Sequence, residues 1–198
     1  MKIAILGWGS LLWDKENSIE FDKWHDPWVF DGPALKVEFS RISESRLGAL
    51  TLVIDEAHGS SVEVAWCFSK RTRVEDAVCD LRCREGTTAA KIGLLDFTLS
   101  TDHSNIGTAE SRNSILEWAR AKGMDAVVWT ALESKFTNER HQPFSVDNAV
   151  SYLRGLPPEG KSKAAEYVWR APAFVETLLR SALQKEPWFQ EQRPSGDP

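Results

Sequence analysis

An apolar strand that runs straight into a glycine-rich turn is the feature that most constrains this chain. Residues 3–6 are all apolar, and residues 7–11 follow at once. Two glycines flanking an aromatic residue let a backbone bend sharply and approach a ligand closely. Successive amides in such a turn can point into one concavity and hold an anion. We therefore expect a ligand-binding loop after a first strand, formed by Gly7, Trp8, Gly9, Ser10 and Leu11.

Composition sets the class of protein. A chain of 198 residues that is 42% hydrophobic and 27% charged is ordinary for a globular protein. We expect one domain over residues 1–185 and a loosely ordered polar tail over residues 186–198. A net charge of −5 leaves no basic footprint for nucleic acid.

The compartment follows from what the chain lacks. No stretch approaches the roughly 18–20 apolar residues of a membrane span, and no small-residue cleavage site follows the apolar start. Three cysteines, an odd number without zinc spacing, favour free thiols in a reducing compartment. We expect a cytoplasmic protein without a membrane partner, whose oligomeric state the sequence leaves open.

Periodicity predicts strands first and helices later. Alternating apolar residues predict strands over residues 34–43, 47–54, 62–68, 89–99 and 125–132. Helical spacing predicts helices over residues 72–84, 109–121, 145–153, 163–169 and 171–184. Runs of antiparallel-looking strands followed by helices are typical of an α+β fold.

Two motifs carry a resemblance to a known family. The loop at residues 7–11 resembles the signature of the γ-glutamylcyclotransferase-like superfamily, in which a strand ends in Tyr-Gly-Ser, and the ChaC-like branch is the most similar. Trp8 stands at the position of the family's Tyr. Residues 81–87 resemble the family's leucine-led helix, which ends here in Arg84, Glu85 and Gly86. The resemblance spans roughly residues 2–169 and implies a small mixed β-barrel with flanking helices.

The resemblance also implies a chemistry. The family's catalytic carboxylate corresponds to Glu85, and the substrate is a γ-glutamyl amide such as glutathione, a γ-glutamyl dipeptide or a γ-glutamylamine. Such a substrate carries its own nucleophile, the α-amine, so that cyclisation to 5-oxoproline needs positioning and one proton-transferring carboxylate, with no cofactor or metal. Arg84 either binds a substrate carboxylate or lies outside the site on the helix surface.

Other interpretations remain open. Glu85 is alternatively a solvated acid at a helix C-terminus, and the fold a non-catalytic module that binds a small molecule or a protein. Residues 155–162 match the phosphate-binding loop pattern through Lys161, but Pro157 and Pro158 remove two amides that would cradle a phosphate. The four histidines are scattered without metal-ligand spacing.

Overall fold

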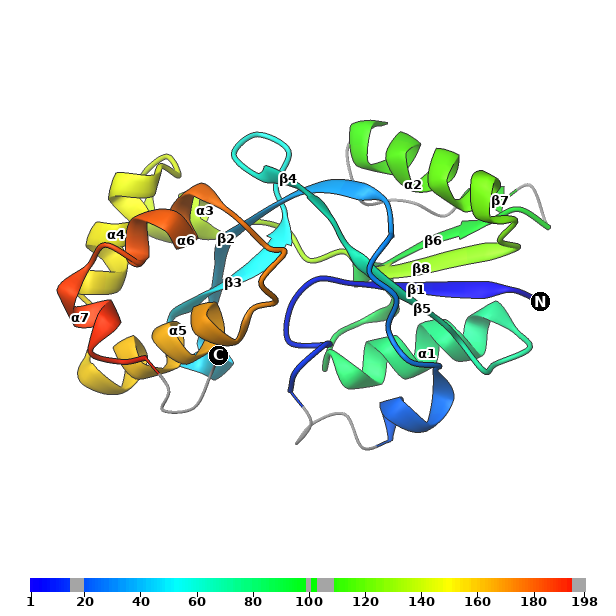
Figure 1. Ribbon diagram of the computed structural model, residues 1–198, viewed down its shortest axis with the longest axis horizontal. Helices are drawn as coiled ribbons and strands as arrows, with labels where there is room; N and C mark the ends of the chain where they lie inside the picture. The colour runs from blue at the N-terminus through cyan, green and yellow to red at the C-terminus, as the bar shows by residue number, and fades with distance from the viewer. Residues whose placement is uncertain (15–19, 99–100, 103–108, 194–198) are drawn as a thin grey trace. The chain divides into compact units, whose positions relative to one another are not determined.

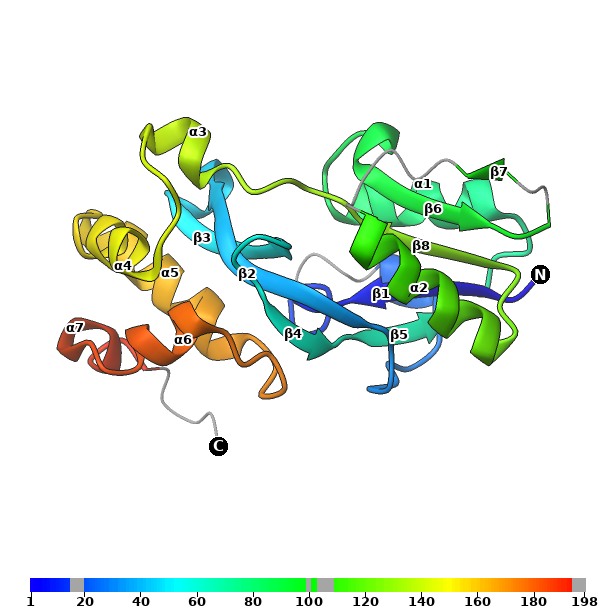
Figure 2. The same ribbon diagram turned by 90° about the horizontal axis from the view of Figure 1, so that it is seen from above.

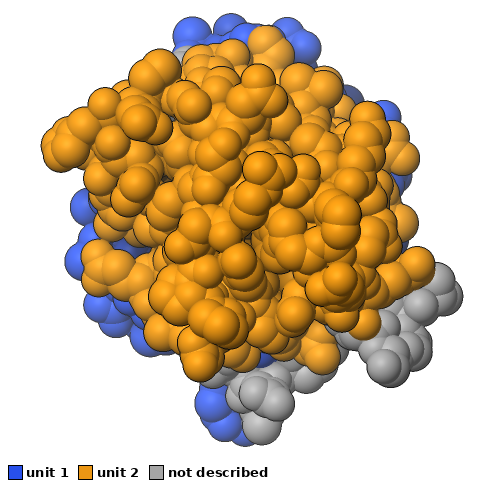
Figure 3. Space-filling view, turned by 90° about the vertical axis from the view of Figure 1, so that its left-hand side faces the viewer, with its two compact units in different colours: residues 1–35, 63–132 blue, residues 36–62, 133–198 orange. Residues whose placement is uncertain are grey.

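The chain divides into two compact units, each described by itself. The computed structural model describes residues 1–14, 20–98, 101–102 and 109–193 (Figure 1). Unit 1 comprises residues 1–35 and 63–132, and unit 2 comprises residues 36–62 and 133–198, coloured separately in Figure 3. A single domain over residues 1–185 stays a prediction. None of the helices in the described ranges is long and apolar enough to cross a membrane.

Unit 1 is built on a five-stranded sheet with the order β5-β1-β8-β6-β7. Strand β1 pairs antiparallel with β5 and parallel with β8, so it has a neighbour on each side. All five residues of β1 are buried, which is why its sequence reads as a continuous apolar run instead of an alternation. The strands are β1 Ile3–Gly7, β5 Ala65–Phe68, β6 Ile92–Asp96, β7 Thr101–Asp102 and β8 Ala126–Thr130.

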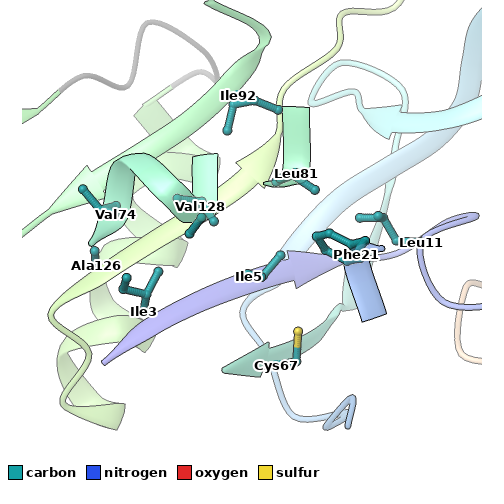
Figure 4. Close-up of a cluster of buried hydrophobic side chains, with 11 residues drawn as sticks. Ile3, Ile5, Leu11, Phe21, Cys67, Val74, Leu81, Ile92, Ala126 and Val128 are labelled. Atoms are coloured by element: carbon teal, nitrogen blue, oxygen red, sulfur yellow. The ribbon is translucent and has the colours of Figure 1, made fainter. Parts of the chain in front are cut away.

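Helices α1 (Val74–Arg84) and α2 (Ala109–Lys122) lie on opposite faces of this sheet (Figures 1 and 2). Side chains of β1, β8 and α1 meet in one apolar core, in which Ile5, Val128 and Leu81 are at most 1% exposed (Figure 4). Short 3-10 helices at Phe21–Trp24 and Ala89–Lys91 complete the unit. The core fixes the position of α1 against the end of β1 from which the glycine-rich turn departs.

Unit 2 contains a three-stranded sheet with the order β3-β2-β4. Helix α5 packs on β3, and the Phe39 and Tyr167 rings meet edge to face with centroids 6.2 Å apart. The strands are β2 Ala34–Ser43, β3 Ala49–Ile54 and β4 Ser60–Glu63, with a 3-10 helix at Glu44–Arg46. The helices are α3 Phe136–Arg140, α4 Val146–Arg154, α5 Pro158–Arg170, α6 Leu178–Leu183 and α7 Pro187–Gln190.

The α+β class is confirmed, but the expected barrel is wrong, because the described strands form two separate sheets and not one closed barrel. The difference arises within the strand predicted over residues 62–68. It breaks at Val64, whose amide donates to Pro33 O and whose carbonyl accepts from Gly32 N. As a result β4 joins one sheet and β5 the other.

The C-terminal region also differs from expectation. Helix α7 lies inside the predicted loose tail, yet its Phe189 is fully buried and stacks on Trp169 with ring centroids 4.8 Å apart. The Trp169 indole N–H donates to Phe189 O over 3.2 Å. Two aromatic residues therefore hold residues 187–190 in place despite their polar neighbours, and residues 194–198 of the predicted tail lie outside the described residues.

The last long helix is shorter than its predicted range of residues 171–184. Only Leu178–Leu183 is helical, and the Thr177 hydroxyl caps it by accepting from Arg180 N. The Arg180 guanidinium donates to the carbonyls of Ala171, Pro172 and Val175 at 2.7–2.9 Å. These bonds satisfy a non-helical backbone that the apolar spacing alone does not reveal.

Candidate functional site

The glycine-rich segment leaves β1 as a single helical turn. Leu12 N donates to Gly9 O over 3.0 Å, and Asp14 N donates to Ser10 O over 2.9 Å. In such a turn the first amides, here those of Ser10 and Leu11, have no partner within the turn itself. The Trp8 and Leu11 side chains are buried, at 5% and 6% exposure. These two side chains therefore serve packing.

The two glycines of the loop are not there for an unusual backbone angle. The described glycines with positive φ are Gly48, Gly86 and Gly123, so neither Gly7 nor Gly9 has a backbone angle that favours glycine. Gly7 instead provides space, because a Cβ atom there would lie 2.9 Å from Cη2 of Trp28. The Trp28 ring packs directly against the end of β1, a contact that no local sequence pattern predicts.

The Glu-Gly motif has a structural explanation at the end of α1. Gly86 has a φ of +57°, which favours glycine. Its amide donates to Cys83 O, and Thr87 N donates to Arg82 O, at 3.2 and 3.1 Å. These bonds form the Schellman motif that ends many helices. The motif fixes Glu85, the half-buried C-cap residue that follows Arg84 at the end of the helix.

Arg84 connects this helix end to the glycine-rich loop. Its Nη2 donates to Ser10 O over 3.1 Å and to Asp14 O over 3.3 Å. Arg84 thus binds the main chain of the loop, and a role in binding a substrate carboxylate stays a prediction. The sequence holds a signal for this placement, since Val74, Ala77 and Leu81 are buried at helical spacing and Arg84 continues that inward row.

The structure therefore brings together the two motifs on which the resemblance rests. Arg84 ties α1 to the turn formed by residues 9–14, and Glu85 follows Arg84 directly. A carboxylate at a helix C-terminus faces the negative end of the helix dipole, which costs typically ~0.3–1 kcal/mol. The arrangement places Glu85, in this unfavourable electrostatic position, on the helix end that Arg84 ties to the turn. The first main-chain N–H groups of a helical turn are of the kind that can bind an anion.

The stretch that matches a phosphate-binding loop is not a loop. Lys161 lies in the first turn of α5, and its amide donates to Pro157 O over 2.9 Å. A phosphate-binding loop follows a strand, whereas helix α4 precedes this stretch. Gly160 allows close packing, because a Cβ atom there would lie 2.8 Å from Leu47 O. Residues 155–157 therefore connect α4 to α5, and residues 158–162 belong to α5 itself.

Within the described ranges, no group of three or more His, Cys, Asp or Glu side chains is arranged to hold a metal ion. Comparisons of the chain with models of protein families, with curated proteins and with solved structures found no match.

Proposed function

We propose that this protein is a γ-glutamylcyclotransferase-like enzyme that releases 5-oxoproline from a γ-glutamyl amide. The observation that carries the proposal is the pair of hydrogen bonds from Arg84 to Ser10 O and Asp14 O. They tie the glycine-rich loop to the helix end that bears Glu85. Arg84 and Ser10 are 74 residues apart in the chain. The cyclotransferase resemblance gives both segments a role in one site.

The reaction needs no external nucleophile. The α-amine of the substrate attacks its own γ-carbonyl carbon, a C–N bond forms in the new five-membered ring, and the bond to the leaving amine breaks. The α-ammonium group first loses a proton, and the leaving amine gains one. Holding the amine against the carbonyl supplies much of the acceleration as a proximity effect.

Glu85 acts as the acid/base in this proposal. Its carboxylate accepts the proton of the α-ammonium group and later delivers it to the leaving amine. The main-chain amides at the start of the 9–14 turn hold either the α-carboxylate or the oxygen that gains negative charge as the amine attacks. Arg84 holds the turn in position and acts through it, so we assign Arg84 as a positioning residue.

The test is a screen of the purified full chain for 5-oxoproline release. Glutathione, γ-glutamyl dipeptides and γ-glutamylamines are incubated separately, and 5-oxoproline is measured by mass spectrometry. Turnover of one of these classes supports the proposal and identifies the leaving amine. Binding of a γ-glutamyl compound by calorimetry without any turnover would contradict it and would favour the non-catalytic module.

A further inference from the structure

A pair of thiols lies on the outer face of α1. Cys79 and Cys83 are four residues apart and both are exposed, whereas the third cysteine, Cys67, is buried in the core. The opposite face of the helix carries the buried side chains of Val74, Ala77 and Leu81. On a helix, side chains four residues apart have Cβ atoms roughly 5–6 Å apart. The two thiols therefore lie next to each other on a rigid element.

The guanidinium group of Arg82 contacts both sulfurs. Nη2 of Arg82 lies 3.8 Å from Sγ of Cys79 and 3.8 Å from Sγ of Cys83. The sulfurs are consequently no more than 7.6 Å apart, the sum of these two distances. The thiolate is the form of cysteine that binds metals. The nearby Asp80 carboxylate is occupied by Arg71, in bonds of 2.7 and 2.9 Å.

We propose that Cys79 and Cys83 form a two-sulfur site for a Cu(I) ion. Thiolates are soft ligands that select Cu(I), and Cu(I) accepts two ligands in a line. With the length of about 2.3 Å known for zinc–sulfur bonds, two metal–sulfur bonds in a line place the two sulfurs about 4.6 Å apart. Rotation of two cysteine side chains four residues apart on a helix reaches this separation.

Charge and protons balance at this site. Each thiol releases its proton to solvent, and each thiolate donates one electron pair to the ion. One Cu(I) with two thiolates carries a net charge of −1, which the adjacent Arg82 neutralises. The copper ion keeps its oxidation state, so that no reductant or oxidant takes part in binding. The site lies on the face of α1 opposite to the buried row, and copper binding is independent of the proposed cyclotransferase activity.

The test is an anaerobic titration of the reduced full chain with Cu(I) in competition with a chromophoric Cu(I) chelator. The expected result is one competed Cu(I) per chain and no change in elution volume on size exclusion. Cys79→Ser and Cys83→Ser should each weaken the competition at least tenfold, because one thiolate is lost. Arg82→Met should weaken it less, because both sulfurs remain.

Cys67→Ala is the matched control and should compete like the wild type, with circular dichroism confirming its fold. Three results would overturn the proposal. They are unchanged competition by both Cys79→Ser and Cys83→Ser, loss of competition in Cys67→Ala with an intact fold, and a copper-linked dimer. The readout is copper and not 5-oxoproline, so a negative cyclotransferase screen leaves this outcome unaffected.

Discussion

In each unit, hydrogen bonds to main-chain groups hold one ionisable side chain, a basic one in unit 1 and an acidic one in unit 2. In unit 1 the Arg84 guanidinium donates to the carbonyls of Ser10 and Asp14. In unit 2 the Glu38 carboxyl accepts from Phe39 N over 2.7 Å and from Leu179 N over 3.3 Å. Glu38 is fully buried, whereas Arg84 is half-buried. Hydrogen bonds between a side chain and the main chain therefore form an internal anchor in unit 2. In unit 1 they support a loop beside the half-buried Glu85.

The anchor in unit 2 should be the more costly to remove. Glu38→Ala leaves two buried amides without acceptors, at roughly 1–3 kcal/mol each, so that the free energy of unfolding should fall by about 2–6 kcal/mol. Urea denaturation measures this change. Glu38→Gln is the control, since its one remaining carbonyl oxygen should restore part of the loss. A decrease below about 1 kcal/mol in Glu38→Ala would show that these hydrogen bonds do not anchor β2 to α6.

The two hydrogen bonds from Arg84 to Ser10 O and Asp14 O form the Arg84 clamp of unit 1. Its removal should cost less stability than the removal of Glu38 and should loosen the glycine-rich loop. Arg84→Met keeps the aliphatic stem and removes both hydrogen bonds, each of the charged-donor type worth about 1.5–3 kcal/mol at full burial. Because Arg84 is half-buried, we expect a loss of about 1.5–3 kcal/mol in all. Hydrogen exchange of the amides of Leu12 and Asp14 should accelerate. Arg73→Met, an exposed arginine preceding the same helix, should change neither quantity, and equal effects in both variants would refute the clamp.

Space at the end of β1 can be tested at Gly7. Gly7→Ala places a Cβ atom 2.9 Å from Trp28, and we expect the overpacking to cost about 1–3 kcal/mol. The double variant Gly7→Ala with Trp28→Phe should recover part of this loss. Gly155→Ala is the control, because its nearest neighbours lie at 3.4 and 3.6 Å. Full stability of Gly7→Ala would show that the indole moves aside without cost.

The smallest expected effect is the pH dependence of unit 2. Burial raises the pKa of Glu38 above its ordinary value of 4.5, and the nearby Asp55 adds to the rise against the hydrogen bonds from Thr177, Phe39 and Leu179. The folded state then binds more protons than the unfolded chain above pH 4.5. The stabilisation is fully present below that pH and is lost as the pH rises through the folded pKa. Urea midpoints across this range should show the slope, and Glu38→Gln should remove it.

Sequence periodicity predicts the elements well where one face is buried. The strand over residues 34–43 matches β2, and the row of Val74, Ala77 and Leu81 predicts α1 to within two residues of its start. It fails where partners distant in the chain decide the outcome. The alternation continues through Val64, and only its bonds to Gly32 and Pro33 separate β4 from β5.

The candidate site follows the same division. The loop and the Glu-Gly motif are local signals, and the Schellman motif gives Gly86 its physical reason. The sequence predicts the Arg84 clamp only in part. Helical spacing places the Arg84 side chain on the inward face, but it does not identify the carbonyls to which the side chain donates. The contact between Gly7 and Trp28 cannot be predicted from the sequence, because Trp28 lies in a stretch without periodicity.

We propose that Glu85 transfers the proton at a site formed with the glycine-rich loop. The most direct measurement is the turnover of Glu85→Gln with a γ-glutamyl substrate that the wild type cleaves. Glu75→Gln, an exposed glutamate in the first turn of the same helix, is the control and should keep wild-type turnover. We expect kcat of Glu85→Gln to fall by roughly 10²–10⁴-fold with little change in KM. Near-wild-type turnover in Glu85→Gln would contradict the account.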